Sequence, residues 1–134
     1  MRNPGQSRLF GVSNAQGLSD VLTGRCETQD AVSGIDSFEN LYVLDGGVPP
    51  PNPQELLSRV AFSYLVETAQ NGFDIVILDT PPILEFADAQ LVACLTKGCL
   101  LAVKREQSRV ADIVNVRSQL QPTAAQLVGA VMFD

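Results

Sequence analysis

Short apolar runs alternate with longer stretches of helical spacing through the second half of the chain. The runs at 73–79, 99–103 and 127–133 are each bounded by turn residues or by the end of the printed sequence, and we interpret them as strands. The run at 73–79 is apolar on both faces between its ends, which is typical of a central parallel strand covered by helices on both sides. Amphipathic patterns at 87–96 and 110–120 separate the runs and predict helices. This order predicts right-handed crossovers, an α/β layered fold and a mainly parallel sheet.

The first half of the chain is more polar, and its elements are shorter. The pattern predicts a short helix over 17–22, a strand over 41–44, and a loop with room for one brief strand over 25–40, whereas residues 1–17 are rich in Gly, Asn and Ser with Leu9-Phe10 as one apolar anchor. A longer helix is predicted from 52 to 72. At its start Asn52 is expected to cap, Pro53 has its φ pre-set for the first turn, and Glu55 is placed to complete a capping box. The face expected to be buried carries Leu57, Ala61, Tyr64, Leu65 and Thr68.

Composition narrows the function classes. The 134 residues are 46% hydrophobic and 18% charged, which suits one domain with a packed core. The net charge of −6 argues against a nucleic-acid binder or direct binding to anionic membranes, and the absence of histidine excludes Ser-His-Asp triads and histidine metal sites. The three cysteines fit neither a zinc knuckle nor a disulfide framework, so Cys94 and Cys99 are expected as reduced core thiols of a cytoplasmic protein. No apolar run approaches the ~20 residues of a membrane span, so membrane association would need a partner.

The residue best placed for chemistry is Asp79. It ends the predicted central strand, and ligands of open α/β sheets bind at the carboxyl ends of the strands. A carboxylate in this position holds Mg²⁺ in P-loop nucleotide-binding proteins, often through water. Thr80 follows, and Pro81 and Pro82 would keep both residues in a rigid, extended turn. The alternative is that Asp79 merely ends a strand, since acidic residues are common in turns.

Four further motifs follow one another along the chain: Arg2-Asn3-Pro4, Gly17-Leu18-Ser19-Asp20-Val21-Leu22-Thr23-Gly24, Pro50-Pro51-Asn52-Pro53-Gln54-Glu55-Leu56-Leu57 and the run from Phe73 to Pro82. In residues and in order, they resemble the bacterial protein tyrosine kinases that belong with the chain-length regulators of capsular and exopolysaccharide synthesis. The resemblance covers nearly the whole chain. It implies a partial P-loop NTPase-like three-layer sandwich, with residues 1–134 forming a single, truncated nucleotide-binding domain.

The resemblance also implies roles for individual residues. Asp79 is similar to the acid that assists Mg²⁺ binding, Thr80 adjoins it at the nucleotide site, and Arg2 resembles the last residue of a second nucleotide motif. Mg·ATP is the cofactor of the complete family member. The sequence contains no Gly-x-x-x-x-Gly-Lys-Ser/Thr loop, so we expect this chain alone to bind no nucleotide and to be inactive. Neither Tyr42 nor Tyr64 matches the family's tyrosine-rich tail, and both are expected in the core.

The partners implied are another copy of the chain or a membrane-bound polysaccharide co-polymerase that activates the kinase. The residues Pro50, Pro51, Asn52, Pro53 and Glu55 are either a subunit interface, as in the family's rings, or only a local turn and cap. In the family, the phosphate-loop strand lies beside the strand that ends at Asp79. Without it, the apolar edge at 75–78 should pair with another copy, rearrange, or leave the chain poorly stable.

The leading functional hypothesis is therefore the C-terminal part of an ATP-dependent tyrosine autokinase domain that regulates exopolysaccharide or capsule synthesis. One alternative is a non-catalytic interaction module, or a split subunit, that binds a kinase or membrane partner. Another is a fragment of a partitioning-type ATPase, which would share the Mg²⁺ carboxylate without phosphorylating tyrosine. The Pro-Pro-Asn-Pro block favours the kinase over this ATPase.

Overall fold

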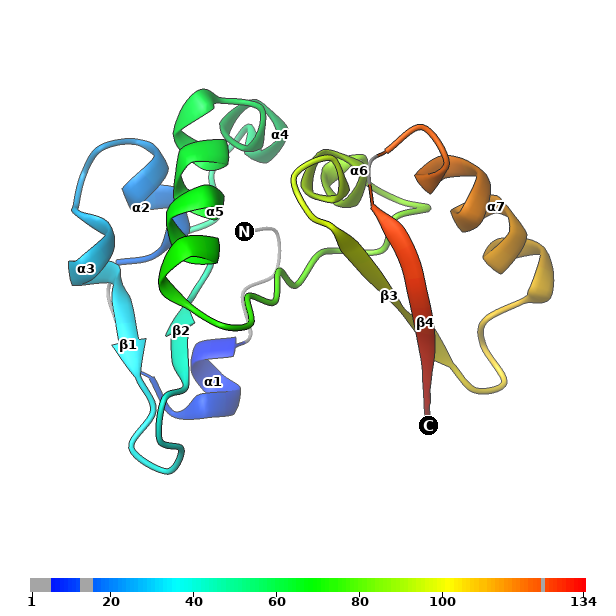
Figure 1. Cartoon of the computed structure of the whole chain (residues 1–134), viewed down its shortest axis with the longest axis horizontal. Helices are drawn as coiled ribbons and strands as arrows, with labels where there is room; N and C mark the ends of the chain where they lie inside the picture. Colours follow the sequence, from blue (N-terminus) through cyan, green and yellow to red (C-terminus); the bar gives the residue numbers. More distant parts are fainter. Residues whose placement is uncertain (1–5, 13–15, 124) are drawn as a thin grey trace. The chain divides into compact units, whose positions relative to one another are not determined.

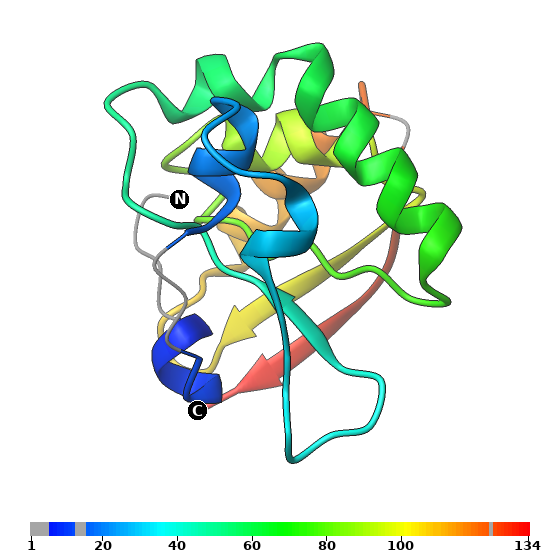
Figure 2. The same ribbon diagram turned by 90° about the vertical axis from the view of Figure 1, so that its left-hand side faces the viewer.

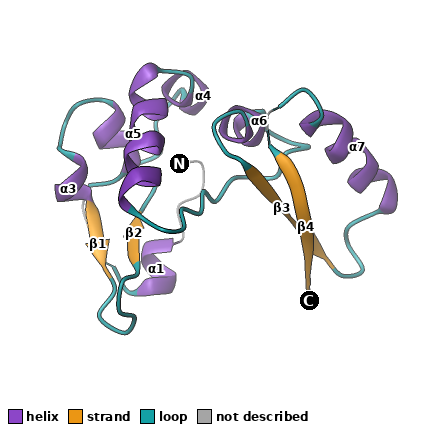
Figure 3. Ribbon diagram, viewed as in Figure 1, coloured by secondary structure: helices purple, strands orange, loops and turns teal. Residues whose placement is uncertain are grey.

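The computed structural model describes residues 6–12, 16–123 and 125–134, and the chain forms two compact units. The first unit is Met1–Phe62 and the second is Ser63–Asp134. Both units combine helices with a small sheet of two strands, so the α/β class expected from the sequence is confirmed (Figure 3).

The first unit is built around a short antiparallel hairpin (Figure 2). Its strands pair Val32 with Leu44 and Gly34 with Tyr42. Its elements are α1 (Gln6–Phe10), α2 (Leu18–Leu22), α3 (Thr28–Ala31), β1 (Val32–Gly34), β2 (Tyr42–Leu44) and α4 (Pro53–Leu57). The predicted helix at 17–22 and strand at 41–44 are confirmed. Helix α3 lies where a loop was expected, and β1 is a brief strand within the same segment, as the prediction allowed.

Helix α2 is attached to the turn that follows β2 by backbone hydrogen bonds. The Leu18 N–H donates to the Asp45 carbonyl at 2.8 Å, and the Ser19 N–H donates to the Gly46 carbonyl at 3.2 Å. The close approach of these two backbone segments requires glycine at a position in each of them. A Cβ on Gly17 would lie 2.4 Å from the backbone nitrogen of Gly47, and Gly47 itself has a φ of +71°, which favours glycine.

The single helix predicted over 52–72 is wrong, because the segment forms two helices, α4 and α5 (Val60–Gly72). Ser58 follows α4, and its hydroxyl donates to the Glu55 carbonyl at 2.8 Å, a local bond that competes with continued helix. The break shifts the buried face of α5 to Phe62 and Val66. Tyr64 is therefore 70% exposed instead of packed in the core.

Other core predictions also need correction. Tyr42 is exposed, because β2 buries Val43 on the opposite face of a sheet that has two strands in the described part of the chain. Cys94 is exposed just after the last residue of a short helix, whereas Cys99 and Cys26 are half-buried. All three thiols are free, as expected. Burial raises the pKa of the Cys99 thiol, which does not favour a reactive thiolate.

The second unit contains a parallel pair of strands with two helices on one face (Figure 1). Its elements after α5 are α6 (Asp88–Ala93), β3 (Gly98–Lys104), α7 (Val110–Leu120) and β4 (Gln126–Phe133). The ladder runs from Gly98 opposite Gln126 to Lys104 opposite Phe133. Ala93 of α6 and Val116 and Leu120 of α7 form a buried cluster, against which Cys99 and Leu101 of β3 pack. The strand–helix–strand unit predicted for this part of the chain is confirmed.

Residues 73–79 do not form the predicted central strand. The segment is extended, but it joins no ladder within the residues that the structure describes. Its side chains still alternate: Ile75 and Ile77 are 79% and 86% exposed, whereas Val76 and Leu78 between them are partly covered. The local conformation is thus strand-like, and what is missing in the described chain is a neighbouring strand to pair with.

Candidate functional site

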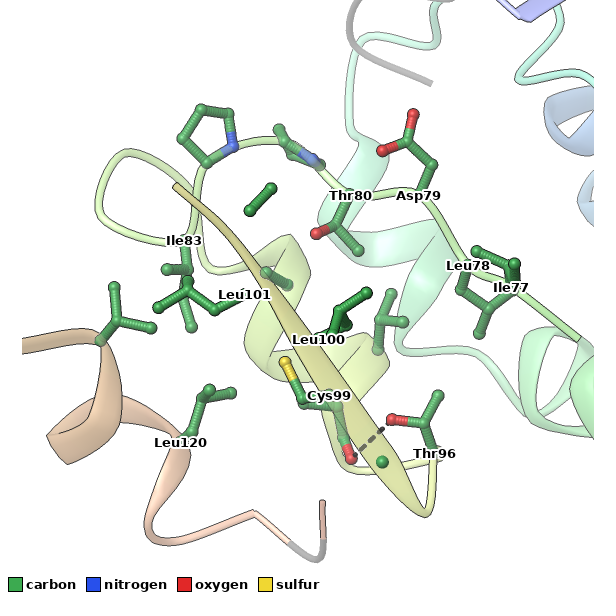
Figure 4. A pocket seen from close by; sticks show the side chains of 18 of the residues that line it. Ile77, Leu78, Asp79, Thr80, Ile83, Thr96, Cys99, Leu100, Leu101 and Leu120 are labelled. Carbon is green, nitrogen blue, oxygen red and sulfur yellow. Dashed lines mark hydrogen bonds between the residues drawn. The ribbon is translucent and has the colours of Figure 1, made fainter. Parts of the chain in front are cut away.

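Asp79 lies at the end of the extended segment, with its side chain exposed (Figure 4). Thr80 comes next and is half-buried. The Thr-Pro-Pro sequence keeps the chain extended, as predicted, and a turn forms only afterwards, where the N–H groups of Glu85 and Phe86 donate to the Pro82 carbonyl at 3.1 Å. The prolines thus hold Asp79 and Thr80 ahead of the turn, on a backbone that cannot enter a helix there.

The same segment lines a groove in the second unit with a volume of about 1080 Å³. One side consists of residues from 73–85, and strand β3 contributes the residues from Gly98 to Lys104 (Figure 4). The lining is mainly apolar and includes Ile77, Leu78 and Leu100. Asp79 is one of its acidic side chains, and Lys97 and Lys104 are its basic ones. The groove therefore combines an apolar wall with a few charged groups.

The residues present fit one part of a Mg·ATP site. An exposed carboxylate such as that of Asp79 suits Mg²⁺, which keeps several of its waters and takes one or two protein carboxylates. The described residues contain no group of three or more Cys, Asp or Glu side chains arranged to hold a metal, so Asp79 would serve as a single ligand. The printed sequence also lacks the glycine-rich loop whose backbone N–H groups grip phosphates.

Two other sets of predicted site residues lie elsewhere. Arg2 lies outside the described residues. The segment from Pro50 to Glu55 belongs to the first unit, where Pro51 and Asn52 are exposed and Pro53 is buried at the start of α4. The structure therefore brings Asp79 and Thr80 together in one groove of the second unit, whereas the proline-rich set forms the entry to α4 in the first unit.

The predicted capping role of Asn52 is wrong. Its side chain makes no bond to the helix backbone, and its amide instead donates to the Glu55 carboxylate. Arg59 donates to the same carboxylate from one turn further along. These bonds stabilise the charged form, so Arg59 and then Asn52 lower the pKa of Glu55 below its usual value. Asn52 thus bonds to the side chain of Glu55 instead of capping the backbone of α4.

Replacing Arg59 with alanine should raise the pKa of Glu55 toward its ordinary value, and Asn52→Ala should raise it less. Because the folded pKa is lowered, the ion pair contributes stability above the ordinary pKa of a glutamate and loses it as the pH falls through the folded value. Carbon-13 NMR titration of the Glu55 carboxyl measures both shifts. Arg25→Ala, which removes a partner of Asp20 instead, is the matched control. An unchanged Glu55 pKa in Arg59→Ala would contradict the assignment.

Comparisons with known proteins show similarity over nearly the whole chain. No family model matches the chain. The tyrosine-protein kinase YwqD of Bacillus subtilis is 33% identical over 132 residues, which is 98% of this chain and 55% of YwqD. The solved kinase domain of the Escherichia coli tyrosine kinase ETK matches 97% of this chain and 51% of its own with a TM-score of 0.91 and 31% identity. The crystal structure of the chimerical protein CapA2B2 matches 98% of this chain and 57% of its own, with a TM-score of 0.90 and 34% identity.

The chain is therefore a homologue of bacterial tyrosine kinase domains. The resemblance carried by its motifs is thereby confirmed, with kinase-domain homology over nearly the whole chain. The chain nevertheless spans only about half the length of the curated relatives and solved structures cited here. Within the described residues, no helix is both long and apolar enough to cross a membrane.

The sequence predicted the charged end of the candidate site but did not predict the groove. Leu100 lies in the apolar run predicted as a strand at 99–103, yet its side chain is exposed and lines the groove. The signal was present in the continuous apolar runs at 73–79 and 99–103, which need cover on both faces. Such apolar runs indicate that both faces of each strand need to be covered by other parts of a protein. They do not indicate whether these 134 residues provide that cover.

Proposed function

We propose that the chain is part of an ATP-dependent protein tyrosine kinase domain that autophosphorylates and regulates capsule or exopolysaccharide synthesis. The observation that carries the proposal is the similarity of nearly the whole chain to solved kinase domains, with an exposed carboxylate at the end of the extended segment. This similarity also supports the kinase over a partitioning-type ATPase. The proposed nucleotide site lies at the carboxyl end of a three-layer, mainly parallel sheet in the complete domain.

In this proposal, Asp79 is the residue that holds Mg²⁺, directly or through water, and Thr80 lies next to it at the nucleotide site. The bound Mg²⁺·ATP supplies the phosphoryl group and neutralises charge on the phosphates. The contribution of this chain is to hold the carboxylate in the lining of an apolar groove, on a backbone stiffened by Pro81 and Pro82. Arg2 is proposed as a further contact to the nucleotide.

The proposed working form has protein partners on the cytoplasmic side of a membrane. We propose self-association through Pro50, Pro51, Asn52, Pro53 and Glu55, and activation by a membrane-bound polysaccharide co-polymerase. Pro51, Asn52 and Glu55 are exposed, which supports their use as an interface. The similar solved protein CapA2B2 is a chimera, which supports the proposal that this domain acts together with a partner protein.

A hybrid protein tests the kinase proposal. In the hybrid, these 134 residues replace the matching part of Bacillus subtilis YwqD, which then supplies the remainder of its own chain. We expect phosphotyrosine to accumulate in the purified hybrid when ATP and Mg²⁺ are added, because the phosphate-gripping groups and Asp79 are then in one domain. Immunoblotting with a phosphotyrosine antibody follows the reaction.

Two controls accompany the hybrid. The 134-residue chain alone should accumulate no phosphotyrosine, since its sequence lacks a phosphate loop. Native YwqD, assayed in parallel, shows that the conditions support activity. A hybrid that is folded by circular dichroism, binds ATP and forms no phosphotyrosine would refute the proposed function.

A further inference from the structure

The turn after β2 contains Asp45-Gly46, the one aspartate of the sequence that is followed by glycine. The Gly46 N–H donates to the Asp45 carboxylate oxygen Oδ1 at 2.8 Å. Because Oδ1 is covalently bonded to Cγ, the backbone nitrogen of Gly46 lies close to that carbon. A separation of about 3–3.5 Å between two reacting atoms is typical of an arrangement ready for attack. The turn therefore holds a backbone nitrogen beside the side-chain carboxyl with which it can react.

The surroundings of this pair permit ring closure. Gly46 carries no Cβ to crowd its own nitrogen, and glycine allows the backbone rotation that a ring requires. In the described chain residues 45–47 belong to neither a helix nor a strand, so regular secondary structure does not fix them. Asp45 and Gly46 are both half-buried, which leaves part of the pair open to water.

The sequence contains one other pair of this kind, Asn71-Gly72, but a helix holds it. These are the last two residues of α5, and the Phe73 N–H still donates to the Ala69 carbonyl at 3.0 Å, so helical bonding extends past Gly72. Helical side chains point back toward the N-terminus of their helix, away from the nitrogen that follows. The structure therefore favours Asp45 over Asn71 as the reactive residue.

We propose that Asp45-Gly46 is a spontaneous modification site, which forms isoaspartate through a cyclic imide. First, the Gly46 nitrogen bonds to Cγ of the protonated Asp45 carboxyl, and the N–H proton leaves with the carboxyl hydroxyl as water. Next, a water molecule adds to the main-chain carbonyl carbon of Asp45, and the bond between that carbon and the Gly46 nitrogen breaks. The product is linked through Cγ and carries a free α-carboxylate. Nothing is oxidised or reduced.

The modification removes the attachment of α2 to the turn. The Leu18 N–H donates to the Asp45 main-chain carbonyl, which becomes a carboxylate on a side branch in isoaspartate. The main chain also gains one methylene between residues 45 and 46. The turn has little room for it, since even a methyl group on Gly17 would lie 2.4 Å from the Gly47 nitrogen. Helix α2 therefore separates from the turn in the modified chain.

The free α-carboxylate also defines the class of enzyme that would recognise the modified chain. Isoaspartyl carboxyl methyltransferases transfer a methyl group from S-adenosylmethionine to this carboxylate. The ester closes to the imide with loss of methanol, and hydrolysis of the imide returns part of the chain to aspartate. The proposal is independent of the kinase function, because the modification needs only the chain and water.

The test follows the full 134-residue chain during prolonged incubation in neutral buffer. Peptide mapping separates the aspartate and isoaspartate forms at residue 45 by retention time, and methyl transfer from labelled S-adenosylmethionine by the methyltransferase measures the isoaspartate. The comparison is the free peptide acetyl-Tyr-Val-Leu-Asp-Gly-Gly-Val-amide, which has the sequence of residues 42–48 without the fold. We expect the folded chain to form isoaspartate at least as fast as the peptide. Reaction at Asn71 would change the mass, so the two sites are distinguished.

Three variants locate the reaction. Asp45→Glu keeps the carboxylate but needs a six-membered ring, and Gly46→Ala crowds the attacking nitrogen, so each should lower the yield at this turn by at least about tenfold. Asp36→Glu changes an exposed aspartate in the turn between β1 and β2 of the same unit and should leave the yield at Asp45 unchanged. Circular dichroism checks that all three variants fold.

Amide hydrogen exchange tests the effect on α2. In incubated wild-type chain, the peptide covering residues 17–24 should show a fast-exchanging fraction equal to the fraction that carries isoaspartate. Incubation with the methyltransferase and S-adenosylmethionine should reduce both fractions together. Incubated Asp45→Glu should show no such fraction.

Each other outcome overturns a stated part of the proposal. Absence of isoaspartate at residue 45, or slower formation than in the free peptide, would show that the fold does not promote the reaction. Undiminished methyl transfer to both Asp45→Glu and Gly46→Ala would place the modification elsewhere. Isoaspartate at residue 45 without the fast-exchanging fraction would refute the release of α2.

Discussion

Asp79→Asn is expected to lower the rate of tyrosine phosphorylation by the YwqD hybrid by about a hundredfold or more. Asparagine keeps the shape of the side chain and one oxygen, but it removes the negative charge that attracts Mg²⁺. A hundredfold loss corresponds to about 2.7 kcal/mol of transition-state stabilisation, which is reasonable for one metal ligand. The measurement is the initial rate as a function of Mg²⁺ concentration, and the variant should also need more Mg²⁺ to reach half of its maximal rate.

The matched control is Asp74→Asn in the same extended segment. Asp74 is also exposed, but it lies at the opposite end of the segment, before the apolar residues. Its loss removes the same charge from the protein, so a general electrostatic effect would slow both hybrids equally. We expect Asp74→Asn to retain nearly the full rate. Equal rates for the two variants would contradict the metal-binding role of Asp79.

The sequence predicted those elements whose formation depends on local pattern and on packing within the same short stretch. Helix α7 begins and ends at the predicted residues 110 and 120, and strands β3 and β4 lie within one residue of their predicted bounds. In these elements the apolar positions, the turn residues and the crossover connection all favour the same structure. A local sequence pattern predicts an element correctly when these three signals agree.

Predictions failed where the outcome depended on a competing contact or on a partner strand. The capping role of Asn52 was lost to an ion-pair network at Glu55, and the long helix was broken next to Ser58. Segment 73–79 has the composition of a central strand, but a ladder needs two strands, and composition describes only one of them.

One part of the candidate site was likewise predicted from local sequence, and the other part was not. Asp79 and Thr80 were correctly placed at the end of an extended segment, because the following prolines restrict the backbone locally. The groove beside them was not predicted, since it depends on which side chains lack cover in the folded chain. The sequence indicates that apolar side chains such as Ile77 and Leu100 should be buried. The structure shows that both are exposed.

Gly17→Ala is expected to lower the free energy of unfolding by about 3 kcal/mol, at the upper end of what overpacking usually causes. The added methyl would lie 2.4 Å from the Gly47 nitrogen and 2.6 Å from the Asp45 carbonyl oxygen. These are backbone atoms of a turn, so no side chain can move aside to make room. To relieve the overlap, α2 must separate from the turn and break the hydrogen bonds from Leu18 and Ser19.

Gly72→Ala is the matched control for the same chemical change. Gly72 is the last residue of α5, and a Cβ there meets no atom within 4 Å. Alanine should therefore raise the free energy of unfolding, by at most about 1 kcal/mol, through its higher helix propensity. Urea denaturation measures both variants, and amide exchange at Leu18 and Ser19 shows whether the loss in Gly17→Ala begins at the contact between α2 and the turn. If Gly17→Ala left both the stability and these two amides unchanged, the close backbone approach would not be what attaches α2 to the turn after β2.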